Sequence, residues 1–145
     1  KDAAFIDTTL EFIGACHGGP DRKYVKMQNK LHVASGSHPI ARGLGEIDVF
    51  EEFYYRLKTT KASRGITPIL NVKIEGNDET AAWAWDRPDG GRSFGYVGLH
   101  FHKNWEFDSY RRLVLQAILW TLQTPIPEAG VPSVECPAEV IKLPN

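Results

Sequence analysis

Residues 87–105 read Arg-Pro-Asp-Gly-Gly-Arg-Ser-Phe-Gly-Tyr-Val-Gly-Leu-His-Phe-His-Lys-Asn-Trp, and this stretch decides how the second half of the chain folds. The proline and two glycines at positions 88–91 supply the backbone dihedrals of a tight reversal. Strand-forming residues lie on both sides of it, in Thr80–Trp85 and in Arg92–Leu99. We therefore predict an antiparallel β-hairpin, with His100 and His102 directly after its second strand.

Outward from the hairpin, the hydrophobic spacing predicts helices and further strands. Apolar residues three and four positions apart indicate helices over Phe5–Ile13 and Asp108–Leu122. Runs rich in branched and aromatic side chains predict strands at Leu31–Ala34, Asp48–Leu57 and Ile66–Ile74. After Gln123, the residues Pro125, Pro127, Pro132 and Pro137 disfavour a helix and predict an extended tail.

Length and charge exclude several classes of protein. A chain of 145 residues has room for one domain. With 17 basic and 18 acidic residues and no basic cluster, the chain lacks the charge pattern of a nucleic-acid binder. No apolar run approaches the roughly 20 residues that span a bilayer, so no membrane partner is expected. The sequence does not settle the compartment, and the chain reads as soluble.

Several blocks of the sequence together resemble one family. They are residues 87–105 above, Arg111–Trp120, Pro127–Val131, the block His38-Pro-Ile-Ala-Arg-Gly-Leu44 and the block Glu51-Glu-Phe-Tyr-Tyr55. In order and spacing they resemble the end of ThuA-like (trehalose-utilisation) domains, relatives of the class I glutamine amidotransferase fold. The resemblance covers residues 10–131.

This resemblance implies an α/β fold of the flavodoxin-like, class I glutamine amidotransferase-like type, a three-layer sheet with a β-hairpin before the last helix. Residues 1–131 would form a partial ThuA-like domain, and residues 132–145 an extended C-terminal tail. Such domains begin with parallel strands and helices that would precede Lys1, so the N-terminal half is expected to be missing. An open sheet edge would then be covered by that half or by a second protein chain, which also predicts an oligomer.

His100 and His102 are the first candidates for catalysis. Two residues apart on an extended backbone, they point to one side, where the strand ends before the last helix. Ligands of open α/β sheets bind at such strand ends, and in the amidotransferase relatives this strand end carries the catalytic histidine. The family pattern directs Glu52 toward the same site. The alternatives are that one histidine caps the helix and the other packs, or that His100, His102 and Glu52 hold a divalent metal such as zinc.

Three further side chains are candidates for binding a sugar. Trp105 and Tyr54 offer aromatic faces for the apolar side of a sugar ring, while Trp83 and Trp85 are expected mostly in the core. Asn104 would either bind a hydroxyl group or cap the following helix.

The resemblance implies an enzyme of carbohydrate metabolism that acts on a sugar or a 3-keto-sugar derivative, of isomerase, lyase or hydrolase type. A histidine would remove an acidified proton beside a carbonyl, with Glu52 or the second histidine as the complementary acid. The alternative is a non-catalytic carbohydrate-binding or interaction module completed by another chain.

A rival hypothesis concerns Cys16. The pattern Gly14-Ala-Cys-His-Gly18 fits a nucleophile elbow, in which a strained turn between a strand and a helix exposes a thiol. With His100 as the base, it would indicate a cysteine amidotransferase. Helical spacing before Gly14 and Pro20 after the motif argue against it.

Overall fold

The computed structural model describes residues 3–142. Its helices are α1 (Ala3–Ile13), α2 (Asp108–Thr121) and α3 (Ala138–Ile141), and its 3-10 turns are η1 (Pro39–Ala41), η2 (Ala62–Arg64) and η3 (His102–Glu106). Its strands are β1 (Ala15–Cys16), β2 (Lys23–Val33), β3 (Ile47–Tyr55), β4 (Lys58–Thr59), β5 (Thr67–Ile74), β6 (Asn77–Asp86) and β7 (Arg92–Tyr96).

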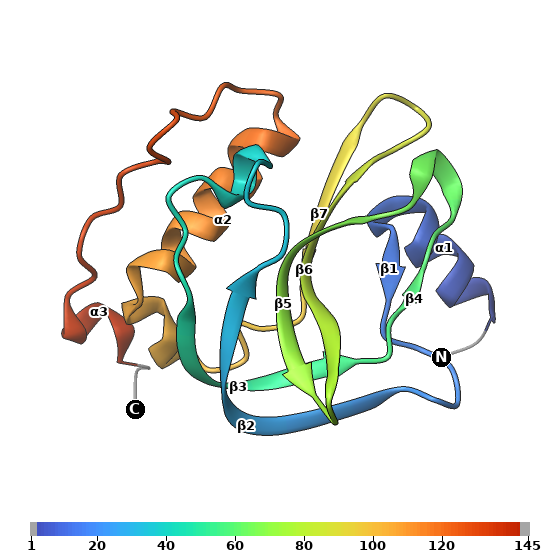
Figure 1. Ribbon diagram of the computed structural model, residues 1–145, viewed down its shortest axis with the longest axis horizontal. Coiled ribbons are helices and arrows are strands. Elements are labelled where there is room, and N and C mark those ends of the chain that lie inside the picture. Colours follow the sequence, from blue (N-terminus) through green and yellow to red (C-terminus); the bar gives the residue numbers. More distant parts are fainter. Residues whose placement is uncertain (1–2, 143–145) are drawn as a thin grey trace.

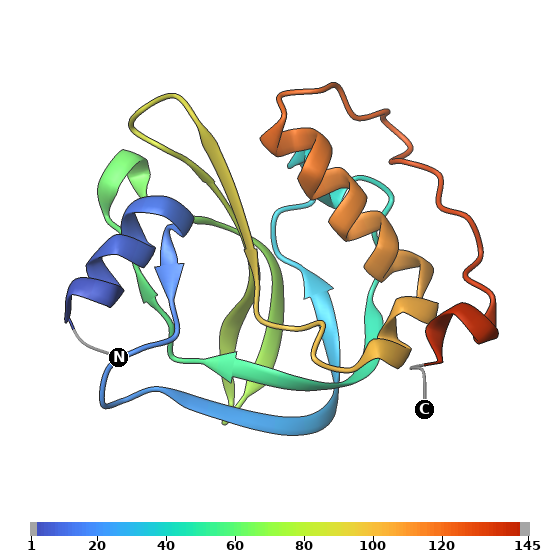
Figure 2. The same cartoon turned by 180° about the vertical axis from the view of Figure 1, so that it is seen from behind.

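The centre of the molecule is a strongly curled sheet of five strands in the order β3-β2-β5-β6-β7 (Figure 1). Every neighbouring pair in this sheet is antiparallel. The short strands β1 and β4 form a separate antiparallel pair beside α1. Both views place the β6–β7 hairpin between α1 on one side and α2 on the other (Figures 1 and 2). The fold is thus mixed α/β.

Within residues 3–142, the antiparallel sheet does not confirm the flavodoxin-like, three-layer arrangement that the resemblance implied. Parallel neighbours need a crossover connection of a dozen or more residues, usually a helix. Here β5 and β6 are joined by only Glu75 and Gly76, both with positive φ, which is the geometry of a two-residue hairpin. The connection between β6 and β7 spans only residues 87–91, which is also too short for a crossover, so these strands run antiparallel.

The predicted hairpin is confirmed. β6 pairs with β7 from Ala82↔Tyr96 to Asp86↔Arg92, although β7 ends at Tyr96 rather than Leu99. Its turn is closed by the Gly90 N–H, which donates to the Arg87 carbonyl over 3.1 Å, and Gly90 adopts φ +81°.

The two main helices and the strands over residues 47–55 and 67–74 also agree with the sequence pattern, and Gly14 at φ +83° follows the end of α1. Two predictions, the strand at Leu31–Ala34 and the extended tail, agree with the structure only in part. The strand predicted at Leu31–Ala34 is the end of the longer β2, whose first part is half exposed and lacks an apolar run. The tail contains one helical turn, α3, because Pro137 precedes it as its N-cap and does not interrupt it.

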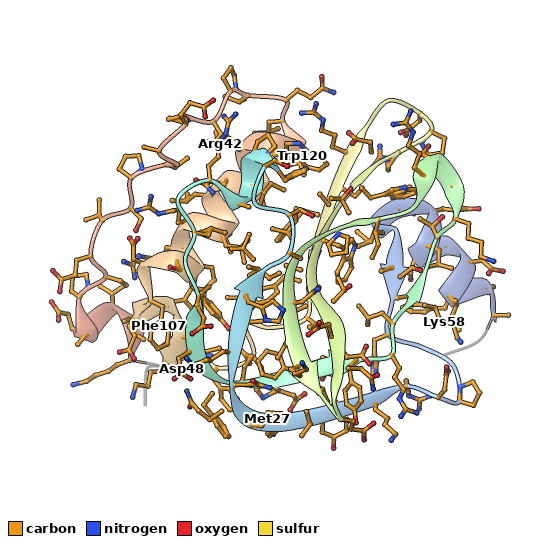
Figure 3. The ribbon with its side chains drawn as sticks, in the orientation of Figure 1. Met27, Arg42, Asp48, Lys58, Phe107 and Trp120 are labelled. Carbon is orange, nitrogen blue, oxygen red and sulfur yellow. The ribbon has the colours of Figure 1, made fainter. Side chains whose placement is uncertain are left out.

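The core lies between the sheet and α2. It is built from Leu31, Val49, Phe53, Leu70, Val72 and Ala82 on the strands and from Tyr110, Leu113, Ala117 and Trp120 on the helix. Figure 3 shows Phe107 and Trp120 at opposite ends of α2, with side chains filling the space toward the sheet. On the other face, the Trp83 indole donates to the Ile13 carbonyl at the end of α1. Trp83 and Trp85 are both buried, as expected.

The nucleophile-elbow hypothesis for Cys16 is wrong. An elbow runs from a strand through a tight turn into a helix, whereas here the helix α1 comes first and Cys16 lies in the strand β1 that follows it. The thiol is buried and free of any disulfide. Among residues 3–142, no helix combines the length and apolar character needed to cross a membrane.

The turn predicts a specific glycine requirement. Gly90→Ala should lower the free energy of unfolding by about 1–2 kcal/mol, because a side chain at positive φ approaches the following carbonyl. Gly45→Ala is the matched control, since its added methyl group meets no atom within 4 Å and its φ lies outside the left-handed region. Urea unfolding would measure both. Equal midpoints for the two variants would contradict the turn geometry.

Candidate active site

Glu52 lies on the outward face of β3 and gathers polar partners around its carboxylate. The register places Lys26 of β2 directly opposite, and the Lys26 Nζ is 3.1 Å from Glu52 Oε2. The Tyr54 hydroxyl donates to Glu52 Oε1 over 2.5 Å, since residues two apart on a strand share a face. Tyr54, a sequence candidate for sugar binding, thus lies beside Glu52.

His100 reaches the same carboxylate from the segment after β7. Its Nδ1 is 3.7 Å from Glu52 Oε1, within ion-pair range when the imidazole is protonated. The His100 side chain is 43% exposed, whereas that of Glu52 is 7% exposed. The structure thus brings His100 and Glu52 together at an open surface, with the carboxylate at its base.

The surroundings keep Glu52 ionised. The Tyr54 hydrogen bond is the largest cause that lowers the pKa of the Glu52 carboxyl, and Lys26 and the charge of His100 act in the same direction. Partial burial opposes them without prevailing. The same hydrogen bond raises the pKa of Tyr54, so its hydroxyl stays protonated. A carboxylate is therefore available at neutral pH to orient an imidazole.

Aromatic rings border this polar centre on two sides. On one side, the Tyr54 ring lies 4.6 Å from the His17 ring and 6.0 Å from the Tyr24 ring, measured between centroids. On the other side, the Phe101 ring lies 5.3 Å from Phe50 and 4.7 Å from His100. Such rings suit the apolar face of a sugar, and the charged centre suits its hydroxyl groups.

His102 does not join this site, contrary to the prediction. The two histidines do not lie on one strand, because β7 ends at Tyr96 and Leu99 turns the backbone at φ +67°. His102 begins η3 instead, and its Nδ1 contacts the Ile141 carbonyl beside α3. The expected cluster of two imidazoles and one carboxylate is therefore reduced to one of each.

Trp105 lies with His102, away from Glu52. The two residues line a cavity of about 220 Å³ together with Arg111, Cys136, Val140 and Ile141. The expected place of Trp105 at the rim of the His100 site is not found, because η3 turns the chain toward the C-terminal segment.

Asn104 is buried and takes neither of its expected roles. Its amide nitrogen donates to the Phe50 carbonyl over 3.0 Å and to Glu51 Oε2 over 2.9 Å. The N-cap position of α2 is occupied by Phe107, without a side-chain cap. Asn104 therefore ties η3 to β3 inside the molecule.

Glu51 is the residue that the sequence reasoning missed. Its side chain is fully buried, and its carboxylate accepts hydrogen bonds from the Leu99 and His100 backbone N–H groups over 2.9 and 3.1 Å. A signal was present in the strand pattern. Positions 47, 49, 51, 53 and 55 alternate onto the buried face of β3, so parity alone places Glu51 inside and Glu52 outside.

No metal set emerges from the part of the chain that the structure describes. Residues 3–142 contain no group of three or more His, Cys, Asp or Glu side chains arranged to hold a metal ion. The proposed trio fails because His102 faces α3 while His100 faces Glu52.

Acid titration tests the environment of Glu52. Because its partners lower its pKa below the ordinary value of 4.5, the carboxylate contributes stability that is full above that pH and is lost as the pH falls through the lowered pKa. Glu52→Gln should therefore show a shallower decline of melting temperature below about pH 5 than the unmodified chain. Glu46→Gln, which removes an exposed carboxylate paired with Lys30, serves as the control. Parallel curves for Glu52→Gln and the unmodified chain would contradict this account.

Comparison with known proteins identifies a family for this sequence. No curated protein and no solved structure matches the chain significantly. One family model does match, over residues 3–121, and its description is ThuA: Trehalose utilisation. The matched range includes β3 with Glu51 and Glu52 and the segment that carries His100 and His102. Since the match spans most of the sequence, the chain belongs to the ThuA family.

Proposed function

We propose that this chain is a carbohydrate-converting enzyme that acts on a sugar or a 3-keto-sugar derivative at the surface around Glu52 and His100. The observation that carries the proposal is the 3.7 Å approach of the His100 imidazole to a carboxylate held by Tyr54 and Lys26. Membership of a family described by trehalose utilisation supports a carbohydrate substrate.

In this proposal His100 is the general base. With Nδ1 directed at Glu52, its Nε2 is free to take a proton from the carbon beside a carbonyl group. The C–H electrons then form an enolate, and the Glu52 carboxylate stabilises the imidazolium. The proton returns from Nε2 to the enolate, so no other reactant is needed. The low pKa of Glu52 suits this orienting role better than that of proton donor.

Lys26 completes the proposed machinery. Its ammonium group lies 3.1 Å from Glu52 Oε2 and is half exposed, so it can meet a negative charge that develops on the substrate oxygen. The Tyr24, Tyr54, Phe50 and Phe101 rings would bind the apolar faces of the sugar on either side.

The alternative function is a carbohydrate-binding module without turnover. It is favoured by the openness of the surface, because His100 is 43% exposed and Tyr24 is 62% exposed. Enzymes usually enclose their substrates more fully. Binding without chemistry would need the aromatic rings but not the His100 imidazole.

A deuterium-exchange experiment separates the two functions. A 3-keto-glucoside is incubated with the chain in D2O, and NMR follows deuterium incorporation beside the carbonyl. His100→Gln should slow the exchange by about a hundredfold or more, because general-base catalysis contributes at least that factor. His102→Gln is the matched control and should keep the original rate. Equal losses in the two variants would contradict the assignment of His100, and ligand binding without exchange in the unmodified chain would favour the binding module.

We also propose that another polypeptide segment extends the sheet along β7. This strand is the last in the sheet order, with its outer edge between the two helices (Figure 2). Both helices carry exposed apolar residues: Phe5 and Phe12 on α1, and Leu115 and Ile118 on α2, with Leu122 at its C-cap. An added strand would form hydrogen bonds with the backbone groups at the edge of β7. Apolar side chains on both of its faces would cover the exposed apolar residues of the two helices.

Native mass spectrometry tests this second proposal. The expected result is an assembly larger than the 16.3 kDa chain when the protein is isolated from its own cells. Ile118→Lys should weaken the assembly, since it places a charge beside the cavity that Phe94, Val114 and Ala117 line. Val134→Lys, at an exposed residue on the distant tail, should leave it intact. A monomer in every sample would contradict the proposal.

A further inference from the structure

The Glu51 carboxylate gathers hydrogen bonds from four separate parts of the chain. Its Oε1 accepts from the Glu52 and His100 N–H groups, over 2.8 and 3.1 Å. Its Oε2 accepts from the Leu99 N–H and the Asn104 amide, each over 2.9 Å. The Tyr110 hydroxyl completes the set, over 3.2 Å to Oε2. The donors come from β3, the segment after β7, η3 and α2.

Burying the Glu51 carboxylate costs free energy unless all of these hydrogen bonds are formed. The side chain of Glu51 is fully buried, on a strand face otherwise lined by Val49, Phe53 and other apolar residues. A buried carboxylate needs hydrogen bonds from every side, and buried N–H groups need an acceptor. An apolar residue of similar size would fill the space but remove the acceptor that the five donors share.

The constraint acts directly on the backbone that carries His100. Leu99 has φ +67°, a conformation that a leucine rarely adopts because its side chain meets the following carbonyl. The N–H groups of Leu99 and of His100 both donate to Glu51. The carboxylate therefore holds the turn at the point where the chain must bend to direct the imidazole toward Glu52.

We infer that Glu51 is a positioning residue, which presents His100 to Glu52 through the Leu99–His100 backbone. The inference rests on the proposed function, in which the His100–Glu52 pair acts on substrate. Adjacent residues on β3 thus have different roles. Glu52 faces the His100 imidazole on the outer surface, and Glu51 holds the His100 backbone from the interior. Because the Glu51 side chain is fully buried, it does not contact a substrate bound at the surface.

Two buried tyrosines support the carboxylate from the core. The Tyr96 hydroxyl donates to the Tyr110 hydroxyl over 2.6 Å, and the latter donates to Glu51. Burial is the largest cause that raises the pKa of Tyr110, and the Glu51 charge acts in the same direction. Tyr110 therefore remains a hydroxyl donor at neutral pH.

The test replaces Glu51 with glutamine, which keeps the shape but turns one acceptor oxygen into a donor. Amide hydrogen exchange, followed residue by residue by NMR, should rise at Leu99 and His100 by about tenfold or more, the size expected from losing a hydrogen bond to a charged group. Amides of the β2–β3 ladder provide the internal reference. Glu46→Gln is the isosteric control at an exposed position, and it should leave both amides unchanged.

Kinetics on the 3-keto-glucoside provide the second measurement. Glu51→Gln should lower kcat while KM changes little, because the sugar-binding rings remain in place, and the loss should vanish in a His100→Gln background. Unchanged exchange at Leu99 and His100, a rise shared equally by the whole sheet, or unaltered kcat in Glu51→Gln would overturn the inference. If the unmodified chain has no turnover, the proposed function fails by itself, and the exchange at the two amides still decides whether Glu51 holds the His100 backbone.

Discussion

The buried carboxylate of Glu51 is the interaction on which the candidate site depends. It joins β3 to three consecutive stretches that lie 48 to 59 positions later in the chain, namely the segment after β7, η3 and α2. The groups that donate to Glu51 are uncharged, so no cation among them offsets the cost of burying its carboxylate. The buried carboxylate is therefore stable only when several hydrogen bonds form together. The geometry around His100 is therefore coupled to the packing of the core.

The geometry of the antiparallel sheet links the buried Glu51 to the polar surface around Glu52. Successive side chains of a strand point to opposite faces, so a buried Glu51 requires an outward Glu52. Cross-strand pairing then brings Lys26 against Glu52, and the strand period brings Tyr54 to the same face. One strand thus supplies both the anchor of the His100 turn and the charged partner of its imidazole.

The structure shows where the residues of the matched family region lie relative to one another. The family model covers the strand with the paired glutamates and the segment with the two histidines, and the structure separates those histidines into different environments. His100 meets a carboxylate at an open surface, while His102 contacts the C-terminal segment near α3. The proposed reaction at Glu52 would therefore use His100 and not His102.

The sequence by itself determined the local structure of this protein. Pro88 and Gly90 specified the hairpin, the three-to-four spacing specified α2, and the alternation of β3 already implied that Glu51 is buried. These features depend on dihedral preferences and side-chain periods within a few residues, which a sequence records directly.

Only the tertiary structure decided which residues meet. The approach of His100 to Glu52 depends on the curl of the sheet and on the left-handed turn at Leu99, and the separation of His100 from His102 depends on the same turn. No local preference predicts a leucine with positive φ. It is held there by hydrogen bonds to a carboxylate 48 positions earlier in the chain, a contact that forms only when the whole sheet has folded.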